Sequence, residues 1–186
     1  MPQGPAPLRL VEPSRERLTG YKAALAAGWS PDTTRDVSAA QLAAIARDPA
    51  GFIAGLLRQD GTVRTATGAV VPRLPGCVRW LDDGEFCGAI NLRYMAGSEA
   101  LPDYVSGHVG YAVVPWKRRR GYATRALALL LPLAQAAGLR RIELTCDEDN
   151  DASRRVILNN GGVPLGRRTE ADGNRKLVFA IGLTAP

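Results

Sequence analysis

The stretch that decides the fold is residues 108–137, HVGYAVVPWKRRRGYATRALALLLPLAQAA. Apolar residues alternate in its first part, 108–114, which predicts a strand. Pro115 ends that strand, because proline cannot donate to a strand ladder. A basic segment then leads to Gly121, and an apolar run from Tyr122 predicts a long helix. The stretch therefore predicts a strand, a basic glycine turn and a helix.

This junction has the chemistry of an anion site. The first N–H groups of a helix have no intrahelical partner, and the helix dipole makes that end positive. Gly121 lets a ligand approach the backbone, and the arginines at 118–120 add charge and forked donors. Such a turn suits a phosphate or pyrophosphate, although an isolated basic run is also typical of a solvated turn. The other common phosphate motifs, the P-loop and the dinucleotide fingerprint, are absent.

Segment 118–123, RRRGYA, resembles the acyl-CoA loop of the GNAT superfamily of N-acetyltransferases, Gln/Arg-x-x-Gly-x-Gly/Ala. The preceding residues 113–115 are similar to the fourth strand of that family. Segments 150–153 (NDAS) and 160–162 (NGG) are similar to its later CoA-contacting helix and the turn after it. The resemblance covers about residues 76–182 well, and the N-terminal part only in its order of elements. The run HVGY also resembles a branch containing ribosomal-protein N-terminal acetyltransferases, which usually have glutamate at the position of His108.

The resemblance implies an acetyl-CoA-dependent N-acetyltransferase that moves the acetyl group directly to a primary amine. It implies no metal. The cofactor contacts that it implies come from the strand end, the basic loop and the later helix, and they are Ala112, Val113, Val114, Arg118, Arg119, Arg120, Gly121, Tyr122, Ala123, Thr124, Asn150 and Ser153.

Two proton transfers need catalytic groups. His108 is the only histidine, and its ordinary pKa of about 6.5 suits a general base, with a hydrogen-bonded strand histidine as the alternative. Glu99 and Asp103, in the loop before the strand, are the next candidates. The family often has a tyrosine on its second helix that protonates the leaving thiolate, but Ile157 stands there. The acid is therefore left open between water and another side chain, with the tyrosines Tyr104, Tyr111 and Tyr122 as candidates.

An acidic run, DEDN at 147–150, follows the predicted strand 141–146. Ligands gather at the carboxyl ends of strands in open α/β sheets, so the run could attract a cationic amine. Acidic residues also stabilise the start of a helix, and a helix is predicted at 152–159. The sequence leaves both interpretations open.

Length and composition set further limits. The chain has 186 residues, of which 46% are hydrophobic, which predicts one domain over 1–186 with a loose start at 1–6. No apolar run reaches the roughly 20 residues that cross a bilayer, so no membrane partner is expected. The N-terminus lacks the organisation of a signal peptide. Three sparse cysteines without metal spacing predict reduced thiols in a cytoplasmic protein.

The net charge of +6 suggests a negatively charged ligand or partner. A nucleic acid is the weaker interpretation, because the arginines lack interleaved aromatic residues and a reading motif. CoA carries a pyrophosphate and a 3′-phosphate, so it accounts for much of the excess. We expect a small-molecule or peptide amine as substrate and leave a homodimer open. A CoA-binding regulatory domain without turnover is the alternative, because the family's tyrosine is missing.

The rest of the chain predicts an α/β (α+β) fold. It is a GNAT-like mixed, mostly antiparallel sheet with helices on both faces and a parallel strand–helix–strand unit. Ser14 and Ser38 are predicted helix N-caps, and residues 60–75 a loop or weak hairpin. The predicted strands are 7–12, 77–81, 85–94, 108–114, 141–146, 163–168 and 175–181.

Overall fold

The computed structural model describes residues 6–65, 68–170 and 173–183. The expected loose start at 1–6 lies outside the described residues, apart from residue 6. A four-stranded antiparallel sheet has the order β1-β4-β5-β6. Its strands are β1 (Arg9–Val11), β4 (Gly76–Asp82), β5 (Phe86–Arg93) and β6 (Val109–Val113). A second antiparallel sheet has the order β7-β9-β8, with β7 (Arg141–Asp147), β8 (Val163–Thr169) and β9 (Arg175–Gly182). The weak hairpin is confirmed as β2 (Thr62–Arg64) and β3 (Val70–Pro72).

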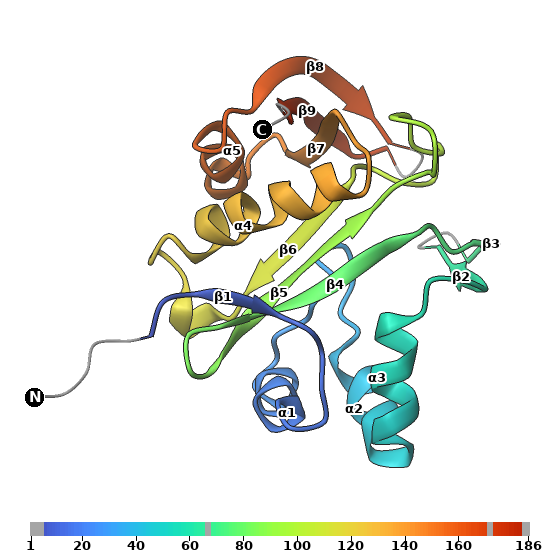
Figure 1. Cartoon of the computed structure of the whole chain (residues 1–186), viewed down its shortest axis with the longest axis vertical. Coiled ribbons are helices and arrows are strands. Elements are labelled where there is room, and N and C mark those ends of the chain that lie inside the picture. Colours follow the sequence, from blue (N-terminus) through green and yellow to red (C-terminus); the bar gives the residue numbers. More distant parts are fainter. Residues whose placement is uncertain (1–5, 66–67, 171–172, 184–186) are drawn as a thin grey trace, which may run out of the picture.

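Helices cover both faces of the four-stranded sheet, as predicted (Figure 1). On one face lie α1 (Leu18–Ala26), α2 (Ser38–Arg47) and α3 (Pro49–Leu57). On the other face lies α4 (Tyr122–Ala136), with α5 (Asp151–Leu158) beside it. In the described residues, no helix has the length and apolar character needed to cross a membrane.

Each face of the sheet has its own hydrophobic cluster. The cluster under α4 contains Leu127 and Leu130, which pack with Ile90 of β5 and are fully buried. The cluster under α1–α3 contains Tyr21, whose ring stacks on Trp80 of β4 with centroids 4.8 Å apart. Burying a leucine side chain stabilises a fold by about 1.5–3 kcal/mol, so these clusters fix the sheet between its helices.

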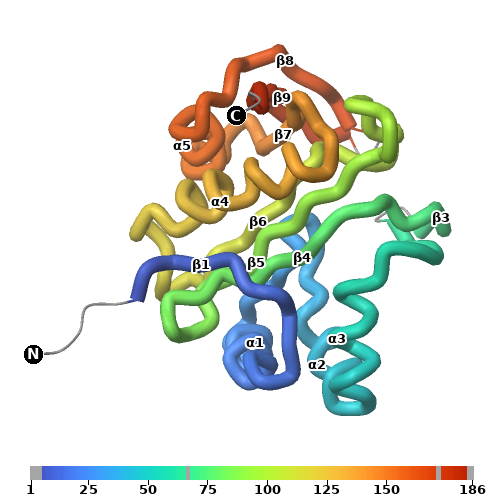
Figure 2. The backbone as a smooth tube through the Cα atoms, in the orientation of Figure 1, coloured from blue at the N-terminus to red at the C-terminus, as the bar shows by residue number. Residues whose placement is uncertain are grey.

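The two sheets share a hydrophobic cluster, and a backbone hydrogen bond joins them just before β6 begins. The chain leaves β6, passes through α4 and returns as β7 in the same direction (Figures 1 and 2). The two strands are not joined in one ladder, because β6 and β7 belong to different sheets. The His108 N–H donates to the Glu143 carbonyl at 2.8 Å just before β6 begins. The predicted strand–helix–strand unit is therefore present, but its two strands are not paired, and the edge of β6 that faces away from β5 is free.

The two helix caps predicted from serines are wrong. The N-cap of α1 is Arg17 rather than Ser14, and the Arg17 side chain forms an ion pair with Asp82 of β4. The N-cap of α2 is Val37, and Ser38 is the first helical residue. Tertiary contacts thus decide where α1 begins, over the local preference of serine.

Candidate active site

The free edge of β6 faces the space between the two sheets. The Val114 N–H donates to the Cys87 carbonyl at 3.0 Å, and the Arg93 N–H to the His108 carbonyl at 2.9 Å. Hydrogen-bonded pairs alternate along an antiparallel ladder, so even-numbered residues of β6 point their backbone groups at β5. The backbone groups that face away from β5 therefore belong to Val109, Tyr111 and Val113. By the same alternation, the backbone of Ala112, an expected cofactor contact, points toward β5.

The basic turn after β6 has an unusual backbone. Arg119, with φ of 58°, is the only described residue other than glycine with positive φ, and Gly121 has φ of 74°. Gly121 is the N-cap of α4 and has no side-chain capping bond. The first N–H groups of α4, at Tyr122, Ala123 and Thr124, thus have neither an intrahelical acceptor nor a cap. Left-handed turns before a helix gather N–H groups into an anion-binding hollow.

Arginine side chains surround this turn. Arg118, Arg119 and Arg120 are all exposed, and no acidic residue stands in the first turn of α4. The Arg118 Nε donates to the Val113 carbonyl at 3.1 Å, so the loop folds back onto the end of β6. The predicted contacts from 118 to 124 therefore form one positively charged surface at the end of the free strand edge.

A buried ion pair anchors the turn to the hairpin between β4 and β5. The Lys117 Nζ donates to both Asp83 oxygens at 2.9 and 3.0 Å, and the Tyr122 hydroxyl donates to Asp83 at 2.6 Å. Burial would raise the pKa of Asp83, but the hydrogen bonds from Tyr122 and Lys117 outweigh it, and the pKa is lowered. Lys117 and the Tyr122 hydroxyl thus hold the loop in place rather than extend into its basic surface.

The start of α5 completes the predicted cofactor contacts. The Asn150 side chain caps this helix by accepting from the Ser153 N–H at 3.0 Å. The Ser153 Oγ lies 2.7 Å from the Tyr111 hydroxyl, which joins α5 to β6. Burial raises the pKa of Tyr111 to about 12, so this hydroxyl stays protonated at neutral pH. Ile157 is fully buried in the core and has no polar atom to offer.

His108 lies at the point where the sheets diverge. It is 1% exposed, and its Nδ1 accepts the Glu143 N–H at 3.0 Å. A backbone N–H can only donate, so the neutral ring carries its proton on Nε2. Burial lowers the pKa of His108, and the nearby Arg93 charge lowers it further. In this tautomer the ring can donate from Nε2, whereas the predicted base function requires a lone pair there.

The other sequence candidates have partners elsewhere. Glu99 pairs with Arg140 at 3.0 Å, and Tyr104 is exposed beside the β2–β3 hairpin. Two residues of the acidic run form ion pairs within their own sheet, Asp147 with Lys176 and Glu148 with Arg167. Asn150 caps α5, and Asp151, the next residue, pairs with Arg154 in that helix, which favours the structural interpretation. Among residues 6–65, 68–170 and 173–183, no group of three His, Cys, Asp or Glu side chains could hold a metal ion.

Sequence reasoning missed two features of the site. Asp83 belongs to the turn 82–84, Asp-Asp-Gly, between two predicted strands, and only the fold brings it to Lys117. The second feature is the pair Asn91 and Arg93, which follow Ala89 at alternate positions of β5 and so lie on the same face of the sheet. The change from an apolar to a polar residue along this face is visible in the sequence.

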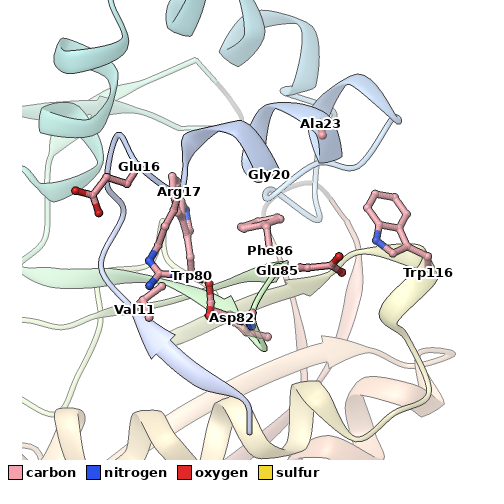
Figure 3. A pocket seen from close by; sticks show the side chains of 12 residues that line it. Val11, Glu16, Arg17, Gly20, Ala23, Trp80, Asp82, Glu85, Phe86 and Trp116 are labelled. Carbon is pink, nitrogen blue, oxygen red and sulfur yellow. Dashed lines mark hydrogen bonds and ion pairs between the residues drawn. The ribbon is translucent and has the colours of Figure 1, made fainter. Parts of the chain in front are cut away.

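An open cleft of about 440 Å³ lies apart from these residues, between α1 and the β4–β5 hairpin (Figure 3). Arg17 and Trp116 lie at opposite ends of it. None of its 12 lining residues is a predicted cofactor contact. The predicted cofactor contacts therefore lie outside this cleft, at the strand edge and the turn.

Comparisons with known proteins agree with this geometry. A family model described as an acetyltransferase (GNAT) domain matches residues 22–163. RimL, a ribosomal alpha-N-protein acetyltransferase solved with coenzyme A, is 15% identical over 96% of each chain, with a TM-score of 0.61. RimJ of Mycobacterium smegmatis, solved with CoA-disulfide, is 23% identical over 97% of this chain and 88% of that chain, with a TM-score of 0.58. MccE, a microcin self-immunity acetyltransferase solved with acetyl-CoA and AMP, is 12% identical over 94% and 92%, with a TM-score of 0.58. No curated protein matches the chain significantly.

Proposed function

Because the chain belongs to the GNAT acetyltransferase family, we propose that it transfers the acetyl group of acetyl-CoA to a primary amine. The observation that carries this proposal is the uncapped start of α4 at Gly121, set directly beyond the free edge of β6. A helix N-terminus with arginines around it suits the pyrophosphate of CoA. The free N–H groups of a strand edge suit an amide-bearing chain such as pantetheine.

The cofactor contacts follow from this placement. The N–H groups of Tyr122, Ala123 and Thr124 would bind the pyrophosphate, with Arg118, Arg119 and Arg120 supplying charge. Val113 would bind the pantetheine arm through its backbone N–H, while Ala112 and Val114 shape the strand end. Ser153 contacts the Tyr111 hydroxyl of β6 through its Oγ, and Asn150 caps the first turn of α5 by accepting from the Ser153 N–H.

The chemistry is a direct attack of the amine nitrogen on the thioester carbonyl, with loss of the thiolate. A backbone N–H on the free edge of β6 would stabilise the negative charge that develops on the carbonyl oxygen. Tyr111 is the acid that the geometry favours, because its hydroxyl is protonated and lies beside Ser153. Tyr122 is held by Asp83, which leaves it unsuited to that step.

The general base stays a prediction. His108 lies at the beginning of the reacting strand, but it can act as a base only in a state that releases the Glu143 N–H. A cytoplasmic location, a homodimer and a single domain over 1–186 also stay predictions. A regulatory domain without turnover stays an alternative, because Ile157 cannot protonate the leaving thiolate. The Tyr111 hydroxyl weakens this alternative, because it could supply that proton.

The test is release of CoA from acetyl-CoA in the presence of a panel of amines, followed by thiol detection and mass spectrometry of the acetylated product. We expect release with at least one class of primary amine. In the same assay, Tyr111→Phe should lower kcat about 100-fold or more, with unchanged affinity for acetyl-CoA. Ile157→Val is the control, because it costs only about 1 kcal/mol of packing and touches no reacting group.

One result would overturn the proposed activity, and another would overturn only the role of Tyr111. A chain that binds acetyl-CoA but releases no CoA with any amine would be the regulatory domain rather than an enzyme. Parental kcat in Tyr111→Phe would leave the transferase in place and assign the acid step to water.

A further inference from the structure

A second group of polar side chains lies on the face of β5 and β6 opposite α4. The register pairs Asn91 with Gly110, and the next inward-facing pair is Arg93 with His108. Side chains alternate along a strand, so these four positions share the face of Ala89 and Ala112. Ala89 and Ala112 pack in the cluster under α1–α3. The polar group therefore lies on the side of β6 where the N-terminal helices pack.

Gly110 leaves the backbone of β6 open beneath this group. A Cβ atom placed on Gly110 would lie 3.3 Å from Asn91 Nδ2 and 3.7 Å from Arg93 Nη2. The two side chains thus converge over a position that has no side chain of its own. A ligand held there would lie against the same strand whose free edge faces the proposed cofactor site.

Two buried polar atoms in this group have no hydrogen-bond partner in the part of the chain that the structure describes. They are the Asn91 Oδ1 and the His108 Nε2. An unpaired buried polar atom destabilises a fold, so such atoms are uncommon in folded proteins and need an explanation. One of them accepts and the other, in the tautomer set by Glu143, donates. Together they match a ligand that offers both an N–H group and an oxygen.

Arg93 supplies an unbalanced positive charge at the same place. Its Nε donates to the Gly107 carbonyl at 2.8 Å, and no described carboxylate lies within ion-pairing distance of it. The acid whose charge acts on Arg93 is Asp32, and Asp32 is already paired with Arg35 at 3.0 Å. The remaining Nη donors form a fork that fits a carboxylate. One uncompensated charge matches a carboxylate better than a doubly charged phosphate.

We propose that the acceptor is an amine that also carries a carboxylate, and that Arg93 binds this carboxylate while Asn91 Oδ1 accepts from the amine N–H. His108 Nε2 donates to the bound acceptor and is a positioning group in this arrangement. The proposal rests on the proposed function and adds the class of acceptor to it. The acceptor approaches β6 from the face of α1–α3, and Tyr111 and Ser153 lie on the opposite face.

The experiment compares amino acids with their carboxamides, which keep the amine and lose the negative charge. Two measurements are made on each pair: kcat/KM by CoA release, and binding of the N-acetylated products in the presence of CoA by calorimetry. The variants are Arg93→Met and Arg93→Lys, with Arg79→Met as the matched control. Arg79 is a partly buried arginine of β4, and alternation places it on the opposite face of the sheet.

We expect the parent to prefer the acids over the carboxamides about tenfold or more in both measurements. The preference should disappear in Arg93→Met, be reduced in Arg93→Lys and persist in Arg79→Met. Equal handling of acids and carboxamides by the parent, or an unchanged preference in a folded Arg93→Met, would overturn the carboxylate site. Turnover of amines without a carboxylate would then leave the transferase function standing. Product binding tests the site even where no tested amine is turned over, and failure of both the acid and the carboxamide products to bind would also overturn it.

Discussion

At the scale of single residues, His108 links the two sheets and has a lowered pKa. It is the only histidine, and burial holds its pKa below the ordinary value of about 6.5. Its Nδ1 accepts the Glu143 N–H, and its own N–H donates to the Glu143 carbonyl, so His108 is bonded twice to β7. A buried neutral histidine of this kind makes the stability of the fold depend on pH.

The sign of this dependence is fixed by the direction of the shift. Below about pH 6.5, His108 is protonated in the unfolded chain but stays neutral in the folded chain. The contribution of this group to the free energy of unfolding is therefore fully present above that pH. It should fall as pH drops toward the lowered folded pKa, with a slope approaching about 1.4 kcal/mol per pH unit. His108→Gln should be less stable at pH 8 and should lack this slope. Urea unfolding of both proteins from pH 8 to 5.5 measures it, and parallel curves would contradict the assignment.

At the scale of elements, the turn between β6 and α4 depends on the β4–β5 hairpin. Asp83 holds Lys117 and Tyr122 in a site where the Asp83 side chain is 2% exposed. Breaking a buried ion pair by removing one partner costs about 3–5 kcal/mol. The loop that carries the proposed pyrophosphate contacts is thus fixed by a residue far away in the sequence.

Asp83→Ala should therefore lower the free energy of unfolding by about 1–3 kcal/mol, because the Tyr122 hydroxyl loses its partner while Lys117 keeps its ion pair with Glu85 at 3.0 Å. It should also weaken binding of acetyl-CoA by the folded protein. Asp60→Ala is the control, because Asp60 is 92% exposed and its pair with Arg58 is worth about 1 kcal/mol at most. Urea unfolding and calorimetric titration give the two quantities. Stability within about 0.5 kcal/mol of the parent would show that the anchor is dispensable.

Local elements could be predicted from the sequence, whereas contacts between distant segments could not. The strand, turn and helix at 108–137 are readable because period, proline, glycine and charge all agree locally. The α1 cap was misread because Arg17 is drawn to Asp82, a contact between distant segments. Lys117 was counted with the basic run for the same reason, since nothing near it in sequence reveals Asp83. The polar face of Asn91 and Arg93 needs the pairing of β5 with β6 to become visible.

At the scale of the whole molecule, β6 separates two environments. One edge is bonded to β5, and the other is free because β7 diverges after the His108 contact. The basic turn and α5 lie at the free edge, and the polar group of Asn91 and Arg93 lies on the face of α1–α3. With the two sites that we propose, the cofactor and the acceptor would reach β6 from different sides without competing for space.

The most direct measurement is a calorimetric titration of the parent, Gly121→Glu and Gly138→Glu with acetyl-CoA. Both glycines are exposed, have φ of 74° and 88°, and lie at opposite ends of α4 with open space around them. The two variants carry the same backbone strain and charge, but only Gly121→Glu puts a carboxylate at the proposed pyrophosphate site. We predict binding by the parent and Gly138→Glu, and binding at least about tenfold weaker by Gly121→Glu. Equal affinities for all three folded proteins would contradict the proposed cofactor site.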